Sequence, residues 1–325
     1  MKQGCMLSPL LFSIYINDLE SEMSAENMHT IPVEDAHLFY LLFADDLTLF
    51  SNTVIGLQRS IDRLHAYCNK WGLTVNTDKT KVMVFRRGGV LKRTEKWYYN
   101  GNPINVVPYF KYLGVTFSSS GGWARNNTLM GEQGKRALNY IRSVKLKLNS
   151  IPYEALCTMF DSMVAPAMTY GSEVWGFGDF SNVENVQTKF CKLVLGVPNT
   201  VPNCVPCAEL GRNHVRCTVY MKIINYWFRV MDMSYTRYPR KCYELQLKWV
   251  EQGVDCWALK VKTLLNSIGM GEVWLFGIGN KNEFLKCFKQ RITDINNQEI
   301  LTKIQDTDML RVYKRIKLTA GKEPY

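Results

Sequence analysis

Two adjacent aspartates between two short apolar segments are the feature that most constrains this sequence. The segments, residues 37–43 and 47–51, are rich in side chains that favour β-strands, and Ala44, Asp45 and Asp46 lie between them. Two such segments joined by so short a connection predict a β-hairpin. Asp-Asp is not a preferred hairpin turn, because the favoured turns use residues that tolerate positive φ. The acids are therefore expected to serve something other than the turn.

Adjacent carboxylates at a hairpin tip repel one another unless a cation compensates them. A hard divalent ion suits them, because Mg²⁺ takes oxygen ligands, commonly one or two carboxylates together with substrate phosphates. Pairs of such ions assist displacement at phosphorus by binding both the attacking and the leaving oxygen. Asp45 and Asp46 therefore predict phosphoryl transfer, and an exposed turn without chemistry is the alternative that the dipeptide alone leaves open.

The neighbouring segments predict helices and further strands. Ser8 and Pro9 favour a helix start, and the helix expected from there to Glu22 is apolar on nearly all sides, which predicts burial. An apolar stripe after Thr53 predicts a second helix, lying on a sheet and ended by Gly72. The remaining strands are expected as a pair at 73–75 and 82–85, as a pair at 97–99 and 104–107 around the Asn100-Gly101 turn, and singly at 112–117.

Charge is unevenly distributed along the chain. Residues 1–50 carry one basic and eight acidic side chains, whereas residues 51–148 carry seventeen basic and four acidic ones, a net charge of +13. A basic segment beside an acidic one suggests a polyanionic partner next to a site that gathers cations. A solvated charged surface is the alternative that composition leaves open.

The cysteines and the hydropathy pattern exclude two classes of protein. The ten cysteines are scattered singly along a chain of 325 residues, which is long enough to bury a core without disulfide bonds. We therefore expect reduced thiols and an intracellular location, nuclear or cytoplasmic. The longest apolar stretches, such as residues 38–44, are far shorter than the roughly 18 residues of a bilayer span. Acidic residues rather than a cleavage site follow the first apolar segment. The sequence predicts neither a membrane protein nor a secreted one.

Four motifs follow one another in order along the first part of the chain. They are Gln-Gly-Cys-Met-Leu-Ser-Pro-Leu-Leu-Phe at 3–12 with Ile-Asn-Asp-Leu at 16–19, Phe-Ala-Asp-Asp at 43–46, Gly-Leu-Thr-Val-Asn at 72–76 with Lys-Thr-Lys at 79–81, and Phe-Lys-Tyr-Leu-Gly at 110–114. They resemble motifs B, C, D and E of the reverse transcriptases of non-LTR, or LINE-type, retrotransposons. Residues 170–176 and 195–198 are similar to recurrent signatures of that family's thumb and following region. Four ordered motifs are far more specific than any one of them.

By this resemblance the chain belongs to an RNA-directed DNA polymerase, a nucleotidyltransferase that extends a DNA primer on an RNA template with deoxynucleotides and Mg²⁺ or Mn²⁺. The resemblance implies Asp45 as a ligand of the catalytic metals and Asp46 as a less direct support of the same site. It also implies that Gln3 and Gly4 lie against the incoming nucleotide or the nascent base pair.

The later motifs imply roles for a lysine and for a turn. Lys79, or alternatively Lys81, would donate a proton to departing pyrophosphate, and a merely solvated lysine in a polar turn is the alternative. Leu113 and Gly114 would form the primer grip, which positions the primer terminus, and an ordinary strand with a glycine bulge is the alternative.

The resemblance also places motif B at the third residue, so that the family's fingers and motif A are not among these 325 residues. Motif A carries the other aspartate that binds the metals in this family. Two ions cannot be held by one hairpin tip, because Mg²⁺ needs near-octahedral oxygen coordination from more than one element. The expectation is an N-terminally truncated fragment that is inactive alone, and a non-catalytic nucleic-acid-binding remnant is the alternative.

The rest of the chain predicts helices. Leu138 and Ile141 mark the apolar face of one helix, and Pro166 should break or kink another. Further helices are expected at 215–231 and 261–265. By the resemblance, the opposite face of the first helix would follow the backbone of a nucleic-acid duplex, and a merely soluble helix is the alternative. The basic residues on this face are Lys135, Arg136, Arg142 and Lys147.

Cys204, Cys207, His214 and Cys217 could supply four ligands to zinc. Their spacing fits no zinc knuckle, and the resembled family has no ligand set here, so ordinary apolar cysteines are expected. A zinc-dependent nucleic-acid-binding module is the alternative.

The predicted fold is α/β and has three parts. A partial polymerase palm of antiparallel strands and helices is expected over residues 1–123. A thumb-like helical region is expected over 124–200, and a helical C-terminal region over 201–325.

Overall fold

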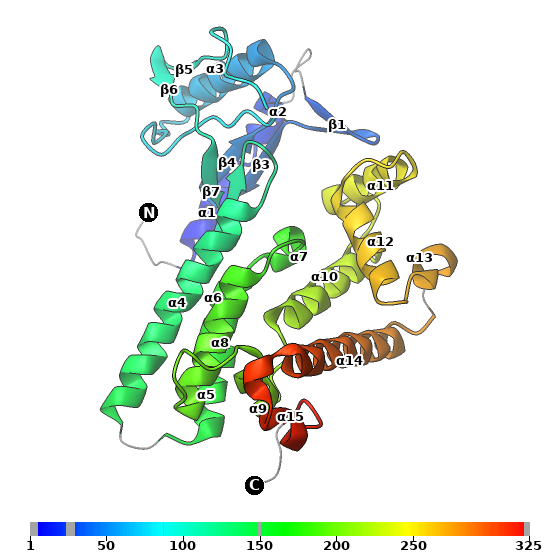
Figure 1. The fold of residues 1–325 in the computed structure, drawn as a ribbon. Helices are drawn as coiled ribbons and strands as arrows, with labels where there is room; N and C mark the ends of the chain where they lie inside the picture. The colour runs from blue at the N-terminus through cyan, green and yellow to red at the C-terminus, as the bar shows by residue number, and fades with distance from the viewer. Residues whose placement is uncertain (1–5, 24–29, 87, 149–150, 278, 322–325) are drawn as a thin grey trace. The chain divides into compact units, whose positions relative to one another are not determined.

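The structure is a computed structural model that describes residues 6–23, 30–86, 88–148, 151–277 and 279–321. These residues form helices and small antiparallel strand pairs, which confirms the predicted α/β class (Figure 1). The chain divides into two compact units: unit 1 comprises residues 1–110, 117–122 and 235–245, and unit 2 comprises residues 111–116, 123–234 and 246–325. The three-part division expected from the sequence stays a prediction. None of the helices in the described ranges is long and apolar enough to cross a membrane.

Unit 1 is built from short hairpins and one long helix. The strands pair as β1–β2, β3–β4 and β5–β6, each antiparallel, and the pair β7–β8 has its turn in unit 2. The elements are α1 (Ser8–Tyr15), α2 (Leu19–Met23), β1 (Ile31–Val33), β2 (Ala36–Leu38), β3 (Tyr40–Phe43), β4 (Asp46–Leu49), α3 (Val54–Lys70), β5 (Trp97–Tyr99), β6 (Asn102–Ile104), β7 (Tyr109–Tyr112) and β8 (Val115–Ser118).

The long helix α3 forms as the sequence predicts. The Thr53 hydroxyl accepts a hydrogen bond from the N–H of Gly56 at 3.0 Å and caps the first turn. The apolar stripe of the helix contacts β4 and β5, and Ile61 and Trp97 are buried in one core cluster. The Trp97 indole N–H donates to the carbonyl of Val54 at 3.1 Å, which fastens the β5–β6 hairpin to the start of the helix.

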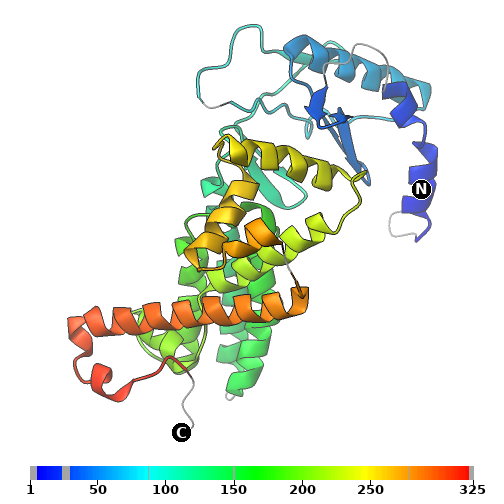
Figure 2. The ribbon, with the colours of Figure 1, turned by 90° about the vertical axis from the view of Figure 1, so that its right-hand side faces the viewer.

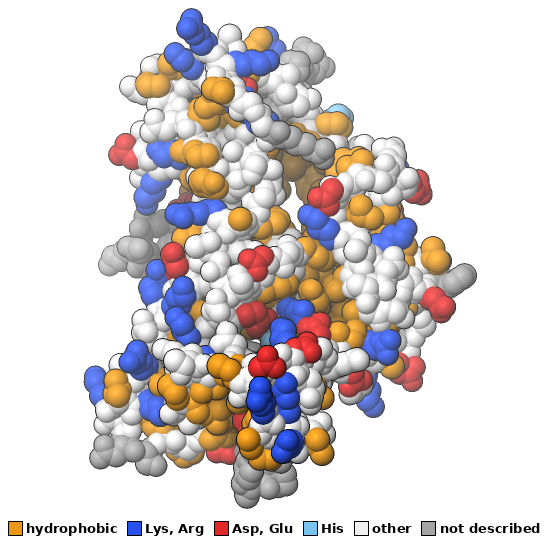
Figure 3. Space-filling view, in the orientation of Figure 1, with side chains coloured by type: hydrophobic (Ala, Val, Ile, Leu, Met, Phe, Trp, Pro, Cys, Tyr) orange, Lys and Arg blue, Asp and Glu red, His pale blue; other side chains and the backbone are white. Residues whose placement is uncertain are grey.

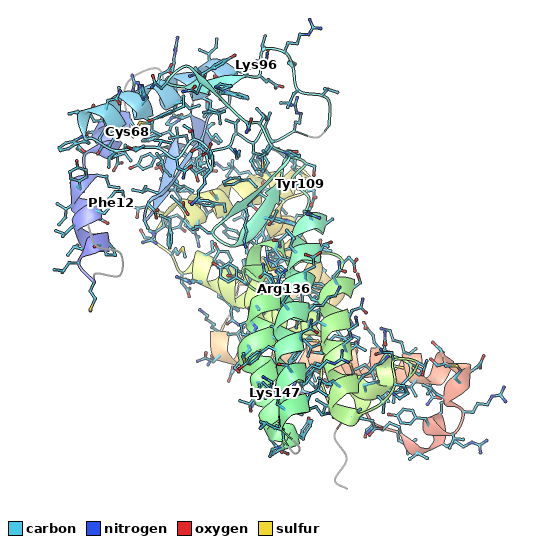
Figure 4. The ribbon with its side chains drawn as sticks, turned by 90° about the vertical axis from the view of Figure 1, so that its left-hand side faces the viewer. Phe12, Cys68, Lys96, Tyr109, Arg136 and Lys147 are labelled. Atoms are coloured by element: carbon cyan, nitrogen blue, oxygen red, sulfur yellow. The ribbon has the colours of Figure 1, made fainter. Side chains whose placement is uncertain are left out.

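The first helix is shorter and more exposed than predicted. It ends at Tyr15, and α2 begins after a turn at Leu19, so no continuous helix reaches Glu22. None of the residues of α1, which includes the Phe12 labelled in Figure 4, is buried, and Ile14 is 63% exposed. An apolar pattern becomes a buried face only where another element covers it. Helix α3 packs against α2, and the ring of Tyr15 at the end of α1 contacts Trp71 after α3, but every residue of α1 stays at least partly exposed.

The predicted hairpin between residues 73–75 and 82–85 is wrong. Val82 instead forms a parallel bridge with Val106. Its side chain is buried in the core cluster that contains Ile61, whereas Leu73 packs in a separate cluster around α2 and the end of α3. The two segments bury their apolar side chains in different core clusters, and for this reason they do not pair with each other.

Unit 2 is helical. Helix α4 packs side by side with α6 and α8, and α14 packs on α9 and α10 (Figure 2). In its core the rings of Phe160 and Phe190 stack with centroids 4.3 Å apart. The elements are α4 (Ala124–Lys147), α5 (Tyr153–Met159), the π-helix η1 (Phe160–Val164), α6 (Ala165–Met168), α7 (Ser172–Trp175), α8 (Ser181–Leu195), α9 (Cys204–Glu209), α10 (Val215–Met231), α12 (Trp257–Ser267), α13 (Glu272–Phe276), α14 (Lys281–Asp306), the 3-10 helix η2 (Asp308–Leu310) and α15 (Tyr313–Ile316), while α11 (Tyr238–Glu251) begins in unit 1 and ends in unit 2.

Two predictions about these helices are confirmed. Pro166 lies in the first turn of α6, directly after the π-helical turn η1. Proline lacks an N–H and crowds the carbonyl four residues back, and the wider turn before it accommodates both defects. The helix predicted at 215–231 coincides with α10, in which Trp227 and Phe228 are buried as core residues.

His214 precedes α10 in a polar network. Its backbone N–H donates to Asn296 Oδ1 at 3.1 Å, and the Glu184 carboxylate accepts hydrogen bonds from the first two N–H groups of α10, both at 3.0 Å. Burial, followed by the positive charges of Arg216 and Lys303, lowers the pKa of the His214 imidazole from 6.5 to about 4. The folded chain therefore holds His214 neutral at pH values where the unfolded chain protonates it.

We expect the stability of unit 2 to rise with pH between about 4 and 6.5, the window set by His214. In this window the unfolded state binds a proton on His214 that the folded state does not, so acid favours unfolding. His214→Gln cannot take up the proton and should weaken this dependence. Urea unfolding of both proteins at several pH values across the window measures it, and equal slopes would contradict the assignment.

Candidate functional site

The β3–β4 hairpin carries the two predicted aspartates at its tip. Phe43 pairs with Asp46, so the turn consists of Ala44 and Asp45, and Asp46 is the first residue of β4. The positive φ of the turn, 53°, falls on Ala44 rather than on an acid. The predicted hairpin is confirmed, with one difference: its first strand begins at Tyr40, because the residues before it belong to the separate β1–β2 pair.

The tip of this hairpin is accessible. Asp45 and Asp46 are both exposed, and Phe43 beside them is 62% exposed. Two exposed carboxylates held at the end of a strand pair fit a hard divalent cation by charge and by donor type. Within the described ranges no three Asp, Glu, His or Cys side chains are grouped so that they could hold a metal ion. The described part of the chain therefore contributes two carboxylates at this tip.

Strand β4 packs on helices α2 and α3. Leu47 and Leu49 pack on a cluster formed by α2 and α3, in which Met23 and Tyr67 are buried. The Tyr67 hydroxyl donates to Asp18 Oδ1 at 2.6 Å, and burial together with this hydrogen bond raises the pKa of Tyr67. This places Asp18, just before α2, in a structural role. The packing of Leu47 and Leu49 on this cluster fixes the position of β4, while Asp46 on the same strand is exposed to solvent.

A second support of unit 1 comes from a distant part of the chain, and sequence reasoning missed it. The Lys241 ammonium of α11 pairs with the Asp35 carboxylate in the β1–β2 turn and lowers the pKa of that carboxyl through the hydrogen bond and the positive charge. The Tyr238 hydroxyl donates to the carbonyl of His37 at 3.2 Å. These contacts join residues about two hundred positions apart, so local sequence patterns do not predict them.

Of the residues predicted to contact the nucleotide and its pyrophosphate, the structure describes the two lysines and not Gln3 or Gly4. Gln3 and Gly4 lie outside the described residues. Lys79 is exposed in a polar turn, where its N–H donates to Asn76 Oδ1 at 3.1 Å. The Lys81 ammonium donates to the carbonyl of Asp78 at 2.7 Å and is occupied within the same turn. Lys79 is therefore the better placed of the two to meet a ligand.

The predicted single strand at 112–117 is wrong, because the chain reverses at Leu113 and Gly114 to form the β7–β8 pair. The two residues have φ values of 45° and 85°. Positive φ at both central residues is the hallmark of the type I′ hairpin turn, which suits Asn-Gly and disfavours leucine. Asn100 and Gly101, at 48° and 75°, form the matching turn of β5–β6 with the preferred residues. Leucine at φ 45° is thus a strained choice.

Side chains on one side of β7 and its turn are presented to solvent. Tyr109, labelled in Figure 4, is 50% exposed, Lys111 is exposed, and Leu113 is 37% exposed, while the residues between them are more covered. An aromatic ring, an ammonium and an apolar tip on one face match the needs of a nucleotide base, a phosphate and a sugar.

Helix α4 presents the predicted basic face. Leu138 and Ile141 are buried, and Lys145 turns away to donate to the carbonyl of Leu193 at the end of α8. Figure 3 shows lysine and arginine side chains along the edge formed by α4, and Figure 4 labels two of the residues. The four residues predicted for this face are all exposed: Lys135, Arg136, Arg142 and Lys147.

Comparison with known proteins agrees with this arrangement. Residues 1–117, which include the β3–β4 hairpin and all but the last residue of the β7–β8 hairpin, match the family model described as reverse transcriptase (RNA-dependent DNA polymerase). Residues 1–117 are therefore similar to reverse transcriptases. Reverse transcriptases use divalent metal ions and act on a nucleic-acid template and primer.

The relatives of this chain include proteins of non-LTR retrotransposons, as the motifs indicated. The RNA-directed DNA polymerase from mobile element jockey of Drosophila melanogaster is 21% identical over 206 residues, which is 60% of this chain and 22% of that protein. A transposon-derived protein of Caenorhabditis elegans is 33% identical over 154 residues, 45% of this chain and 51% of that protein. A Pol polyprotein from retrotransposable element R2 of Popillia japonica is 31% identical over 127 residues, 37% of this chain and 21% of that protein. The chain thus spans between about a fifth and a half of the length of these relatives.

The zinc alternative concerns Cys204, Cys207, His214 and Cys217. The thiols of Cys191 and Cys207 hydrogen-bond each other, and the Cys217 thiol donates to the carbonyl of Ile292 at 3.8 Å. Cys207 and Cys217 thus have different partners, and the described residues contain no group of three or more His, Cys, Asp or Glu side chains that could hold a metal ion. The nine described cysteines are free thiols.

We expect Leu113→Asn to stabilise the chain by about 1 kcal/mol, because asparagine tolerates the left-handed conformation that costs leucine energy. The reverse exchange in the matching turn, Asn100→Leu, should destabilise the chain by a similar amount. Urea unfolding midpoints measure both effects. Lower stability of Leu113→Asn would show that packing of the leucine side chain outweighs its backbone strain.

Proposed function

We propose that this chain supplies the palm and thumb of an RNA-templated DNA polymerase, the reverse transcriptase of a non-LTR retrotransposon. The observation that carries the proposal is the pair of exposed carboxylates, Asp45 and Asp46, at the tip of a hairpin inside the segment that matches the family. The palm corresponds to residues 1–123, the thumb to 124–200, and a helical C-terminal region follows over 201–325.

The reaction joins the primer 3′-oxygen to the α-phosphorus of a deoxynucleotide and breaks the bond to pyrophosphate. Asp45 would hold Mg²⁺, with Asp46 supporting the site, and the ion would supply charge stabilisation at the reacting oxygens. Lys79 would give a proton to the departing pyrophosphate, since it is exposed and Lys81 is occupied. Gln3 and Gly4 are proposed to line the nucleotide pocket.

Two carboxylates on one hairpin are too few for this chemistry. Mg²⁺ needs near-octahedral coordination, and a two-metal site needs carboxylates from more than one element. We therefore propose that a second segment of the parent enzyme faces the β3–β4 tip with a further carboxylate. Until that segment is present, the chain would bind a primer and template without extending the primer.

The nucleic-acid duplex would lie along α4 and the β7–β8 hairpin. The exposed basic residues of α4 would contact the phosphate backbone, which positions a duplex without reading its sequence. Leu113 and Gly114 would meet the primer terminus. The net charge of +13 over residues 51–148, which contain both elements, supports this placement.

We expect the 325-residue chain alone not to extend a primer, and the chain joined to the preceding segment of its parent element to do so with Mg²⁺ and deoxynucleotides. In the joined enzyme, Asp45→Asn should abolish extension and leave duplex affinity unchanged, because the variant loses a metal ligand and no backbone contact. Primer extension and fluorescence anisotropy separate the two effects. Primer extension by the 325-residue chain alone would contradict the proposal that a further carboxylate is needed. A joined enzyme that binds duplex without extending the primer would favour the alternative of a non-catalytic nucleic-acid-binding remnant.

Binding to a DNA duplex should weaken steeply with salt, without sequence preference. Changing Lys135, Arg136, Arg142 and Lys147 to glutamine should lower the affinity and reduce the salt slope by about 0.9 for each phosphate that the protein no longer neutralises. The control is Lys286→Gln with Lys289→Gln on α14, which are also exposed and lie outside the proposed surface; because it removes two charges rather than four, the decreases in affinity are compared per charge removed. Titration at several salt concentrations measures the slopes, and an equal decrease of affinity per charge in both variants would remove α4 from the interface.

A further inference from the structure

The segment of residues 170–176 recurs in the resembled family, and the proposed function leaves it without a role. In the structure it forms a rigid corner between α6 and α7. The Trp175 indole is buried and donates to the carbonyl of Tyr170 at 2.8 Å. The Lys222 ammonium of α10 donates to both oxygens of Thr169, each at 2.8 Å. Gly171 takes a left-handed φ of 66° at the start of α7.

This corner lies directly against the turn proposed as the primer grip, and all the residues involved belong to unit 2. A Cβ atom added to Gly114 would lie 2.8 Å from Cε1 of the Tyr170 ring. A Cβ atom added to Gly171 would lie 2.9 Å from Cγ2 of Val115. Each segment thus places a glycine where the other presents a side chain, and the two backbones approach more closely than any larger residue allows.

The comparison with the other type I′ turn shows that the contact is particular to this site. Around Gly101 no heavy atom lies within 4 Å of an added Cβ atom, and asparagine supplies the local preference for that turn. At Leu113 the local preference is absent, and the conformation must be held from outside. The Tyr170 ring and the Asn126 side chain, which accepts from the N–H of Thr116 at 2.9 Å, provide contacts that hold the turn and the strand after it.

We propose that Tyr170 is a positioning residue for the primer terminus: its ring seats the Leu113–Gly114 turn and so sets where the exposed face of β7 meets the 3′-terminal nucleotide. This inference rests on the proposed function of the turn. Tyr170 acts through the turn and is 53% exposed, so its replacement is compatible with folding. The ring supplies the contact, and the hydroxyl is dispensable for it.

The contact is tested first by unfolding of the full chain. Gly114→Ala adds both a strained φ and a clash with the Tyr170 ring, whereas the control Gly101→Ala, at a φ of 75° with open space around it, adds the strain alone. The Gly114→Ala shift in urea midpoint should therefore be the larger, and the excess should disappear in a Tyr170→Ala background. If Gly114→Ala shifted the urea midpoint equally in the wild-type and Tyr170→Ala backgrounds, the proposed contact between the Tyr170 ring and the turn would be overturned.

The functional part is tested by photo-crosslinking from a 4-thiothymidine at the 3′ end of a primer annealed to template. The wild-type chain should crosslink within β7 and its turn, and Tyr170→Phe should retain the yield. Tyr170→Ala should lower it by about tenfold or more, because a misplacement of reacting atoms by about 1 Å can cost up to about 100-fold. Duplex affinity should be the same for all three proteins.

The outcomes separate this inference from the function on which it rests. Wild-type crosslinks that lie elsewhere, or none at all, would overturn the primer-grip function and the positioning role with it. Crosslinks at the turn that Tyr170→Ala leaves unchanged would overturn only the positioning role. A parallel decrease in Tyr170→Phe would also overturn it, since the ring would then not be the group that acts.

Discussion

Two strand pairs of unit 1, β3–β4 and β5–β6, depend on burial against helix α3. A two-stranded hairpin buries too little apolar surface to be stable in water by itself, so each pair needs a neighbour that covers one face. Helix α3 provides that neighbour twice, because Ile61 packs with Trp97 of β5 and Tyr67 packs beneath the leucines of β4. Hydrogen bonds then fix the orientation, from the Trp97 indole to the start of the helix and from Tyr67 to the turn before α2.

This packing explains why the aspartates end up accessible. Leu47 and Leu49 are drawn toward α2 and α3, and the hairpin tip that carries Asp45 and Asp46 is left in solvent. A carboxylate pair in the core would lose its hydration and take up protons. At the tip the pair stays accessible to a cation, as its proposed role in binding Mg²⁺ needs.

Sequence patterns failed where partners were needed from elsewhere in the chain. The apolar sides of α1 predicted burial, yet Leu10, Leu11 and Ile14 are exposed. The β-prone residues around Val82 predicted a hairpin, but the core cluster drew Val82 to Val106. Lys241 reaches Asp35 from the far end of the chain, and periodicity carries no information about such a pair.

The sequence by itself determined the order of the motifs and the local elements. The order of the motifs, the acids at 45 and 46, the cap and stripe of α3 and the full extent of α10 follow from residue types and spacing, because hydrogen bonding and periodicity act over a few residues. Only the tertiary structure decided that the chain reverses at Leu113 and that Gly114 receives the Tyr170 ring. A leucine adopts a left-handed turn when distant contacts outweigh its own backbone preference, and that balance exists only in the folded chain.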